Sequence, residues 1–261
     1  MARLVPLFSG SSGNSYYIGS RSAGLLLDAG RSAKQLEQMM LRCGVDPLAL
    51  QGILLTHEHS DHISGVRVLA KKYGLPVFGT PGTLNALGAE TLSQVESHPL
   101  EEGLQLAGLT VTSFPTSHDA AQPVGYRILT EDRRTVTLCT DTGVLTEAAL
   151  GALTGADAVI LESNHDPEML RTGGYPLQLN MRILSDHGHL SNAACAGVLA
   201  QLHRAGTRRF LLAHLSRENN TPGLALEAAQ AALTRAGLVD GVDYWLAAAA
   251  PENVTGEPIL F

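Results

Sequence analysis

The densest group of residues that could perform chemistry lies at positions 56–62, with the sequence Thr-His-Glu-His-Ser-Asp-His. A short apolar segment precedes it and predicts a buried strand that ends at His57. Side chains two apart in an extended segment point the same way, so His57 and His59 can reach one metal ion together. Asp61 and His62 follow where the chain turns into a helix, and they can reach a second ion. A solvated polar loop is the alternative, but it gives no reason for this spacing. The pattern therefore indicates a metal site built from imidazole and carboxylate groups.

The composition indicates a folded, acidic protein. The 261 residues include 18 Lys plus Arg and 25 Asp plus Glu, which gives a net charge of −7, and 44% of the residues are hydrophobic. An acidic balance argues against tight, charge-driven binding to nucleic acid. Bound metal ions would add local positive charge that this count omits, so a nuclease stays open.

The cysteines and the N-terminus bear on the cellular compartment. Cys43, Cys139 and Cys195 are far apart and form no Cys-x-x-Cys motif, which argues against a disulfide framework and a cysteine zinc site. The N-terminal residues lack the apolar run of a signal peptide, and no segment is long and apolar enough to cross a bilayer. We therefore expect a cytoplasmic protein with no membrane partner.

Short apolar strands alternate with amphipathic helices, and no shift in composition marks a domain boundary. We therefore expect one domain over residues 1–261. Strands are expected at 4–8, 16–18, 24–28, 52–56, 104–114, 124–138 (with a hairpin tip at 131–134), 158–161, 209–213 and 244–247. Helices are expected at 32–43, 62–73, 191–205 and 224–236.

The spacing His-x-His-x-Asp-His resembles the signature of the metallo-β-lactamase superfamily. Four further residues match the family pattern in order: Asp28, His118, Asp141 and His214. This resemblance implies an α/β (α+β) fold of four αββα layers, with two packed mixed β-sheets flanked by helices. It also implies that Asp28 orients the histidine loop from outside the ligand set.

The resemblance implies two divalent metal ions, Zn²⁺ or Mn²⁺. It assigns one ion to His57, His59, His118 and Asp141. It assigns the second ion to Asp61, His62, Asp141 and His214. Two ions held ~3.5–4 Å apart can bind both the attacking and the leaving oxygen, and they lower the pKa of a bound water toward ~7.

Other segments indicate the branch of the superfamily. The segment 188–191, Gly-His-Leu-Ser, resembles a loop of the ribonuclease Z-like branch, in which the histidine acts near the leaving group. By this resemblance Asp61 and His189 are the predicted catalytic residues. The segments 9–15, 162–166 and 214–222 resemble the YycJ/WalJ group, which implies a 5′-to-3′ DNA exonuclease with DNA as its partner.

The substrate and its contacts are less sharply defined. A glycine/serine loop can offer N–H and hydroxyl donors to a phosphate. The predicted substrate contacts are Ser11, Ser12, Asn14, Asn164 and His165. Basic residues are scattered, and most are read as solvated: Arg31, Lys34, Lys71, Lys72, Arg171, Arg182 and Arg217. A small-molecule metallohydrolase acting on a cyclic phosphodiester, ester or thioester is the alternative, and a metal-stabilised scaffold without activity is a third hypothesis. The sequence leaves the oligomeric state open.

Overall fold

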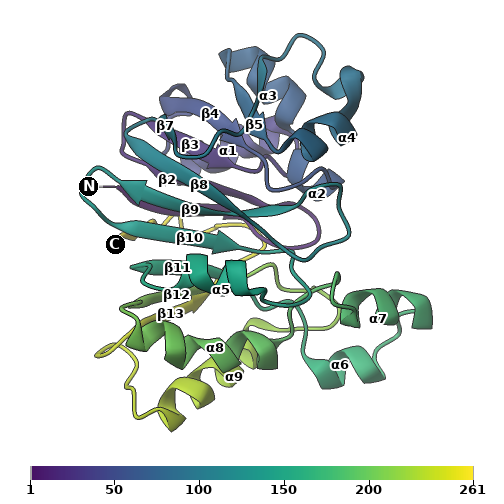
Figure 1. The fold of residues 1–261 in the computed structure, drawn as a ribbon, viewed down its shortest axis with the longest axis vertical. Helices are drawn as coiled ribbons and strands as arrows, with labels where there is room; N and C mark the ends of the chain where they lie inside the picture. Colours follow the sequence, from purple (N-terminus) through teal and green to yellow (C-terminus); the bar gives the residue numbers. More distant parts are fainter. Residues whose placement is uncertain (1, 261) are drawn as a thin grey trace. The chain divides into compact units, whose positions relative to one another are not determined.

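The computed structural model describes residues 2–260, which divide into two compact units (Figure 1). The first unit covers positions 1–113, 120–134 and 250–261, and the second covers 114–119 and 135–249. Each unit is described by itself below. The single domain expected over residues 1–261 stays a prediction.

A mixed sheet of seven strands forms the centre of the first unit, in the order β14-β1-β2-β3-β4-β5-β6. Its strands are β1 (Arg3–Phe8), β2 (Ser15–Gly19), β3 (Gly24–Leu27), β4 (Leu50–Leu54), β5 (Val77–Gly79), β6 (Ser97–Pro99) and β14 (Ile259–Leu260). Strand β3 pairs antiparallel with β2 and parallel with β4. Because parallel strands end at the same edge of a sheet, the residues that follow β3 and β4 lie side by side.

Helices cover this sheet with their apolar faces. They are α1 (Ala33–Arg42), the 3-10 helix η1 (Pro47–Ala49), α2 (Ser60–Ile63), α3 (Val66–Tyr73) and α4 (Pro81–Thr91). Leu36 of α1 and Leu69 of α3 lie in one buried cluster with Leu26 of the sheet. Ser32 caps α1 by accepting a hydrogen bond from the Gln35 backbone N–H, as expected at a helix start. Three further strands complete the unit: β7 (Leu104–Leu106), β8 (Leu109–Pro115) and β9 (Val124–Thr130).

The second unit contains four parallel strands in the order β13-β12-β11-β10. They are β10 (Thr135–Cys139), β11 (Ala158–Glu162), β12 (Arg209–Ala213) and β13 (Trp245–Ala248). The helices are α5 (Glu147–Leu153), α6 (Pro167–Thr172), α7 (Leu177–Leu184), α8 (Asn192–Arg204) and α9 (Pro222–Arg235). Helices α8 and α9 pack against each other (Figure 1). Leu199 and Leu233 bury their side chains with Leu212 in one apolar cluster.

Most expected elements are present, and the differences have local causes. The strand expected at 104–114 is the hairpin of β7 and β8, and the strand expected at 124–138 is divided between β9 and β10 by the predicted tip at 131–134. The helix expected at 62–73 is interrupted between α2 and α3, at Ser64 and Gly65. The sequence patterns did not predict η1, β5, β6, β14 or α4 to α7, which are short or, like α4, contain a non-helical glycine, Gly88. Within residues 2–260, no helix is long and apolar enough to cross a membrane.

Candidate metal-binding site

In the first unit one predicted metal ligand, His62, contacts a buried carboxylate, Asp28, which lies directly after β3. Its Oδ1 accepts a hydrogen bond from the Thr56 backbone N–H, and its Oδ2 accepts from the Thr56 hydroxyl and from His62 Nδ1, each at 2.8 Å. Burial raises the pKa of Asp28, and the charge and hydrogen bonds of His62 and Thr56 offset this only in part. This contact holds the His62 ring in one orientation, and the wider role of Asp28 in orienting the histidine loop stays a prediction.

The histidines that follow β4 lie close together. The ring centroids of His57 and His59 are 4.6 Å apart, and those of His57 and His62 are 4.0 Å apart. Asn14 is buried beside them, and its Nδ2 lies 3.1 Å from Asp61 Oδ2 and 3.0 Å from His62 Nε2. The first unit thus gathers three imidazoles and one carboxylate at the edge of its sheet.

The second unit has its own buried carboxylate, Glu162, at the end of β11. Its Oε1 accepts hydrogen bonds from Nδ1 of both His189 and His214, each at 2.8 Å. Its Oε2 accepts from the backbone N–H groups of Thr142 at 2.9 Å and Leu190 at 3.1 Å. Burial alone would raise the pKa of Glu162, but the two histidines outweigh it and hold this pKa well below its usual range.

Asp141 and His118 complete the polar group of the second unit. Asp141 Oδ1 lies 3.4 Å from His214 Nδ1 and 3.8 Å from His118 Nε2. One ligand atom from each of four residues lies within 4.8 Å of the others: Asp141, Glu162, His189 and His214. The structure therefore brings together the predicted ligands of this unit and adds Glu162, which the sequence analysis did not include among the site residues.

The hydrogen bonds of these rings test whether the donors suit a metal. Nδ1 of His118 lies 3.1 Å from the Gly188 carbonyl oxygen, and Nδ1 of His62 and of His214 lies against a carboxylate. An Nδ1–H donated in this way keeps Nε2 as the unprotonated nitrogen, which is the usual arrangement around metal-bound histidine. At His62 the Asn14 side chain lies 3.0 Å from this Nε2. Burial also lowers the pKa of His118, which favours the neutral ligand form. The donor set fits divalent cations.

Three of these residues have strained backbone. Asp28, Asp141 and His214 each follow a strand, and their φ angles are +57°, +55° and +55°. Residues other than glycine rarely adopt this left-handed region, at a cost of about 1–3 kcal/mol each when the surroundings impose it. The bend at each strand end turns the side chain out of the strand's alternating pattern.

The predicted substrate contacts differ in their exposure. Ser11 is exposed and Ser12 is half-buried, whereas Asn14, Asn164 and His165 are buried. Asn164 Nδ2 donates to the His214 carbonyl oxygen at 2.8 Å, so this side chain holds the loop that follows β12. The role of these five residues in substrate binding stays a prediction.

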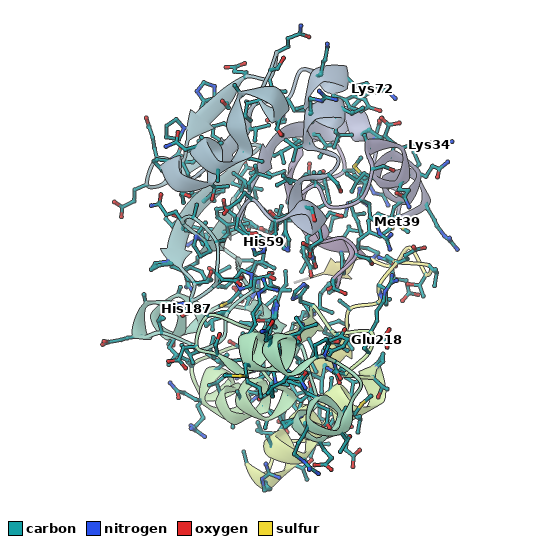
Figure 2. The ribbon with its side chains drawn as sticks, turned by 90° about the vertical axis from the view of Figure 1, so that its right-hand side faces the viewer. Lys34, Met39, His59, Lys72, His187 and Glu218 are labelled. Atoms are coloured by element: carbon teal, nitrogen blue, oxygen red, sulfur yellow. The ribbon has the colours of Figure 1, made fainter. Side chains whose placement is uncertain are left out.

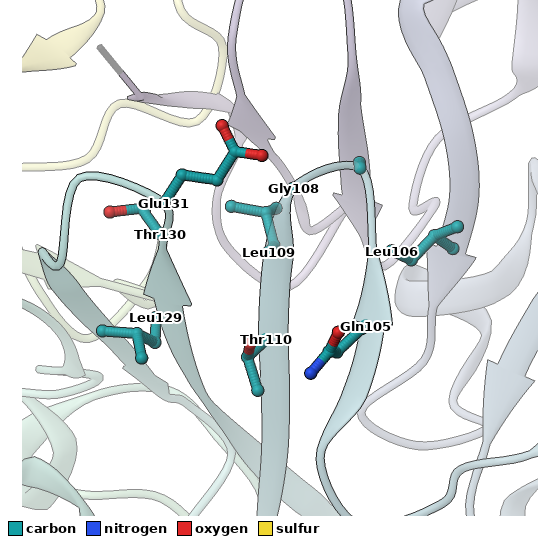
Figure 3. Close-up of a pocket in the computed structure, with 9 residues that line it drawn as sticks. Gln105, Leu106, Gly108, Leu109, Thr110, Leu129, Thr130 and Glu131 are labelled. Atoms are coloured by element: carbon teal, nitrogen blue, oxygen red, sulfur yellow. The ribbon is translucent and has the colours of Figure 1, made fainter.

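A surface cavity in the first unit lies outside this group of residues. It has a volume of about 420 Å³ and lies between the turn of the β7–β8 hairpin and the end of β9 (Figure 3). Glu131 is the one ionisable residue among those that line it, and no histidine lines it. This cavity has none of the groups needed for the predicted chemistry.

Known proteins resemble this chain over most of its length. A family model described as a beta-lactamase superfamily domain matches residues 24–215. Exodeoxyribonuclease WalJ of Streptococcus pneumoniae is 40% identical over 255 residues, which cover 95% of this chain and 94% of WalJ. Exodeoxyribonuclease YycJ of Bacillus anthracis is 42% identical over 223 residues, 84% of each chain.

The chain belongs to the metallo-β-lactamase superfamily. Among solved structures, the metallo-beta-lactamase fold protein YhfI from Bacillus subtilis is similar to it with a TM-score of 0.74 at 19% identity, over 96% of this chain and 97% of YhfI. The strands form two mixed sheets accompanied by helices. The predicted fold class and the resemblance to the WalJ and YycJ group of this superfamily are thus confirmed.

Proposed function

We propose that this member of the superfamily is a metal-dependent phosphodiesterase that degrades DNA as a 5′-to-3′ exonuclease. The observation that carries the proposal is 40% identity to an exodeoxyribonuclease over 95% of the chain. The histidine and carboxylate groups of both units support it, because they are the side chains that such a reaction requires.

We propose two divalent ions, Zn²⁺ or Mn²⁺, as the cofactors. This assignment rests on the motif set, and the ligands are His57, His59, Asp61, His62, His118, Asp141 and His214. When bound, such ions lower the pKa of a coordinated water from 15.7 to about 7 and so supply a nucleophile at neutral pH.

The chain's own catalytic residues are proposed to be His189 and Asp61. Glu162 holds Nδ1 of His189 at 2.8 Å, so the ring can carry and donate a proton at Nε2, toward the leaving oxygen. Asn14 holds the carboxylate of Asp61 at 3.1 Å, which keeps this group in place to accept a proton from the attacking water. Both residues thus have a fixed orientation before substrate arrives.

The remaining parts of the proposal concern substrate and location. Ser11 and Ser12 are proposed to contact the DNA, since their side chains are accessible. Asn14, Asn164 and His165 are proposed to belong to the same substrate-binding region, and because they are buried they would act mainly by holding its loops in place. We also propose a cytoplasmic location and a single domain over residues 1–261.

The experiment uses duplex DNA labelled at either end, with Mn²⁺ or Zn²⁺ added. A 5′-to-3′ exonuclease releases a short labelled product at once from the 5′-labelled strand and a ladder of shortening fragments from the 3′-labelled strand. We expect Asp141→Asn to lower the rate by about 1,000-fold, because it weakens a proposed shared ligand. His98→Ala is the matched control, since His98 is exposed and its ring contacts Glu96 and Phe78, which are not among the proposed ligands.

Two outcomes would contradict the proposal. Equal cleavage by wild type and by Asp141→Asn would mean that the activity does not come from this centre. Turnover of bis-p-nitrophenyl phosphate without any cleavage of DNA would favour the small-molecule hydrolase, which the net charge of −7 also suits.

A further inference from the structure

The glycine/serine turn between β1 and β2 is fixed to the segment that carries Asp61. The Gly13 N–H donates to the Gly10 carbonyl at 3.0 Å, which closes a turn with Ser11 and Ser12 at its centre. The Asn14 N–H donates to the Asp61 carbonyl at 2.8 Å. This turn therefore has a set position beside a predicted catalytic carboxylate, within one unit.

The packing of Gly30 keeps these two segments in contact. A Cβ at this position would lie 1.7 Å from the Asp61 carbonyl oxygen and 2.4 Å from the Asn14 backbone nitrogen. The Gly30 N–H donates to the Asn14 carbonyl at 2.9 Å. Only glycine allows the two backbone segments to come this close. The next residue along the chain is Arg31.

Arg31 lies across the turn in a strained conformation. Its φ is +88°, and its guanidinium donates from Nη2 to Ser12 Oγ at 3.0 Å. The guanidinium carbon lies 5.4 Å from the ring centroid of Phe8, within the range of a cation–π contact. Gly13 leaves room for this path, because a Cβ there would lie 2.6 Å from Arg31 Cγ. Several neighbours thus hold this side chain in one position.

The hydrogen-bonding capacity of this guanidinium is not fully used. The Arg31 side chain is 18% exposed, but its Nε is buried, and none of residues 2–260 accepts a hydrogen bond from it. One carboxylate approaches it, that of Glu252, at 3.4 Å and 50% exposed. By contrast, Arg182 makes two hydrogen bonds to the carboxylate of Asp119, at 2.5 and 2.9 Å. An anion that displaces this loosely held carboxylate can therefore take over its hydrogen bond from Nη2, whereas the buried Nε is out of its reach.

Other basic side chains of the first unit do not share this position. Lys34 and Lys72 lie on the outer surface, away from His59 (Figure 2). Lys72 forms an ion pair with Glu37 at 2.8 Å. The chain has a net charge of −7, and the neighbours of Arg31 hold this basic side chain close to the segment that carries Asp61.

We propose that Arg31 and the turn at 10–13 form a subsite for a phosphate group of the DNA substrate. The planar guanidinium suits phosphate oxygens, and the hydroxyls of Ser11 and Ser12 add donors beside it. The N–H groups of Ser11 and Ser12 take no part in the turn's own hydrogen bond, so they add to the same positive field. The inference rests on the proposed function and extends it by naming where the strand is held.

The test measures binding and cleavage separately. The Kd of a 3′-labelled oligonucleotide with phosphorothioate linkages that resist cleavage is measured by fluorescence anisotropy on the metal-loaded protein, with either a 5′-phosphate or a 5′-hydroxyl end. KM is measured for DNA and for bis-p-nitrophenyl phosphate, which has no strand to hold. The variants are Arg31→Met, Arg31→Lys and Glu252→Gln, and Lys34→Met is the matched control on the same unit.

For Arg31→Met we expect the Kd and KM for DNA to rise by about tenfold, as for the loss of a charge-assisted hydrogen bond, and by more than the KM for the small ester. Arg31→Lys keeps the positive charge but loses the planar pair of guanidinium donors. Its Kd and KM for DNA should lie between those of wild type and of Arg31→Met. Glu252→Gln removes the competing carboxylate and should lower the Kd by about twofold to threefold. If Arg31→Met weakens the binding of 5′-phosphorylated DNA alone, the subsite holds the terminal phosphate. If it weakens the binding of both kinds of DNA equally, the subsite holds an internal phosphate.

The inference is overturned if Arg31→Met binds DNA as tightly as Lys34→Met, or if its KM rises equally for DNA and for the small ester. Should Arg31→Met fail to fold, an unchanged Kd in both Arg31→Lys and Glu252→Gln overturns it. Wild type that binds DNA through Arg31 but never cleaves it would contradict the proposed function alone. Wild type that neither binds nor cleaves DNA would contradict both.

Discussion

Asp28 in the first unit and Glu162 in the second unit occupy comparable positions, at the end of a buried strand and next to histidines. Asp28 accepts hydrogen bonds from the backbone and hydroxyl of Thr56 and from His62. Glu162 accepts from two histidines and two backbone N–H groups. The pKa of Asp28 is raised by its burial, whereas the pKa of Glu162 lies well below its usual range.

The difference shows how many donors a buried carboxylate needs. Burial penalises the charged form of both groups. A second imidazole at Glu162 more than offsets that penalty, and a single imidazole at Asp28 does not. The longer glutamate side chain can also reach ring nitrogens on two separate loops. One residue in the second unit thus orients two histidines, while its counterpart orients one.

The largest effect is expected from Glu162→Gln. The amide places N–H donors where Oε2 accepts backbone hydrogen bonds or where Oε1 accepts from the two imidazoles, so both rings lose their fixed orientation. We expect kcat to fall by about 100-fold to 1,000-fold, which is the combined effect of two misplaced groups. Kinetics with saturating metal, together with the metal content of the protein, measure this. A loss below tenfold would contradict the dual role of Glu162.

A smaller effect is expected from Asp28→Asn, because one histidine depends on it. We expect metal affinity or activity to fall by about 10-fold to 100-fold, the usual range for a residue that orients a single ligand. Competition with a chromogenic chelator gives the metal affinity independently of activity. If this variant loses more than Glu162→Gln, the comparison between the two carboxylates is wrong.

The buried leucines of the two units allow a stability comparison. Leu26→Ala in the first unit and Leu212→Ala in the second should each lower the free energy of unfolding by about 2–5 kcal/mol, through lost burial and the cavity that remains. Denaturant titration measures this. Variants that unfold at the wild-type midpoint would contradict the assigned cores.

The rate of alkylation of the three free cysteines tests whether the two units unfold together. Cys43 lies in the core of the first unit, and Cys139 and Cys195 lie in that of the second. Burial raises the pKa of Cys195 to about 12 and raises the pKa of the other two thiols, so all three should alkylate slowly at pH 8 in the native protein. A single domain predicts that Leu212→Ala speeds labelling of all three thiols, as followed by mass spectrometry. Faster labelling of the second unit's thiols alone would contradict it.

The smallest effect is expected at the exposed ion pairs. Lys72 pairs with Glu37 in the first unit, and Arg171 pairs with Glu168 in the second. Water and salt screen such pairs, so Lys72→Gln and Arg171→Gln should leave the Tm unchanged within error. A clear drop in Tm for either variant would show that its pair stabilises that unit.

The sequence predicted the parts of the site that are encoded locally. His57, His59, Asp61 and His62 lie within six residues, and an apolar strand directly before them determines where they emerge. The buried strands were also predictable, because short runs of apolar residues bounded by turn residues are typical of buried strands. Short helices such as α6 and α7 were missed, since their patterns extend over too few residues.

Tertiary structure alone decided the roles that join distant positions. Glu162 contacts His189 and His214 across 27 and 52 residues, and nothing in its neighbourhood in the sequence indicates either contact. Its place at the end of a buried strand, like that of Asp28, and at the start of the segment 162–166 that resembles the YycJ/WalJ group were the available signals. In the sequence Arg31 is one of several scattered basic residues. Only the fold brings its side chain into contact with the turn at 10–13. The physical reason is that local pattern determines which segments are strands and helices, whereas the packing of those segments determines which polar groups meet and lose their water.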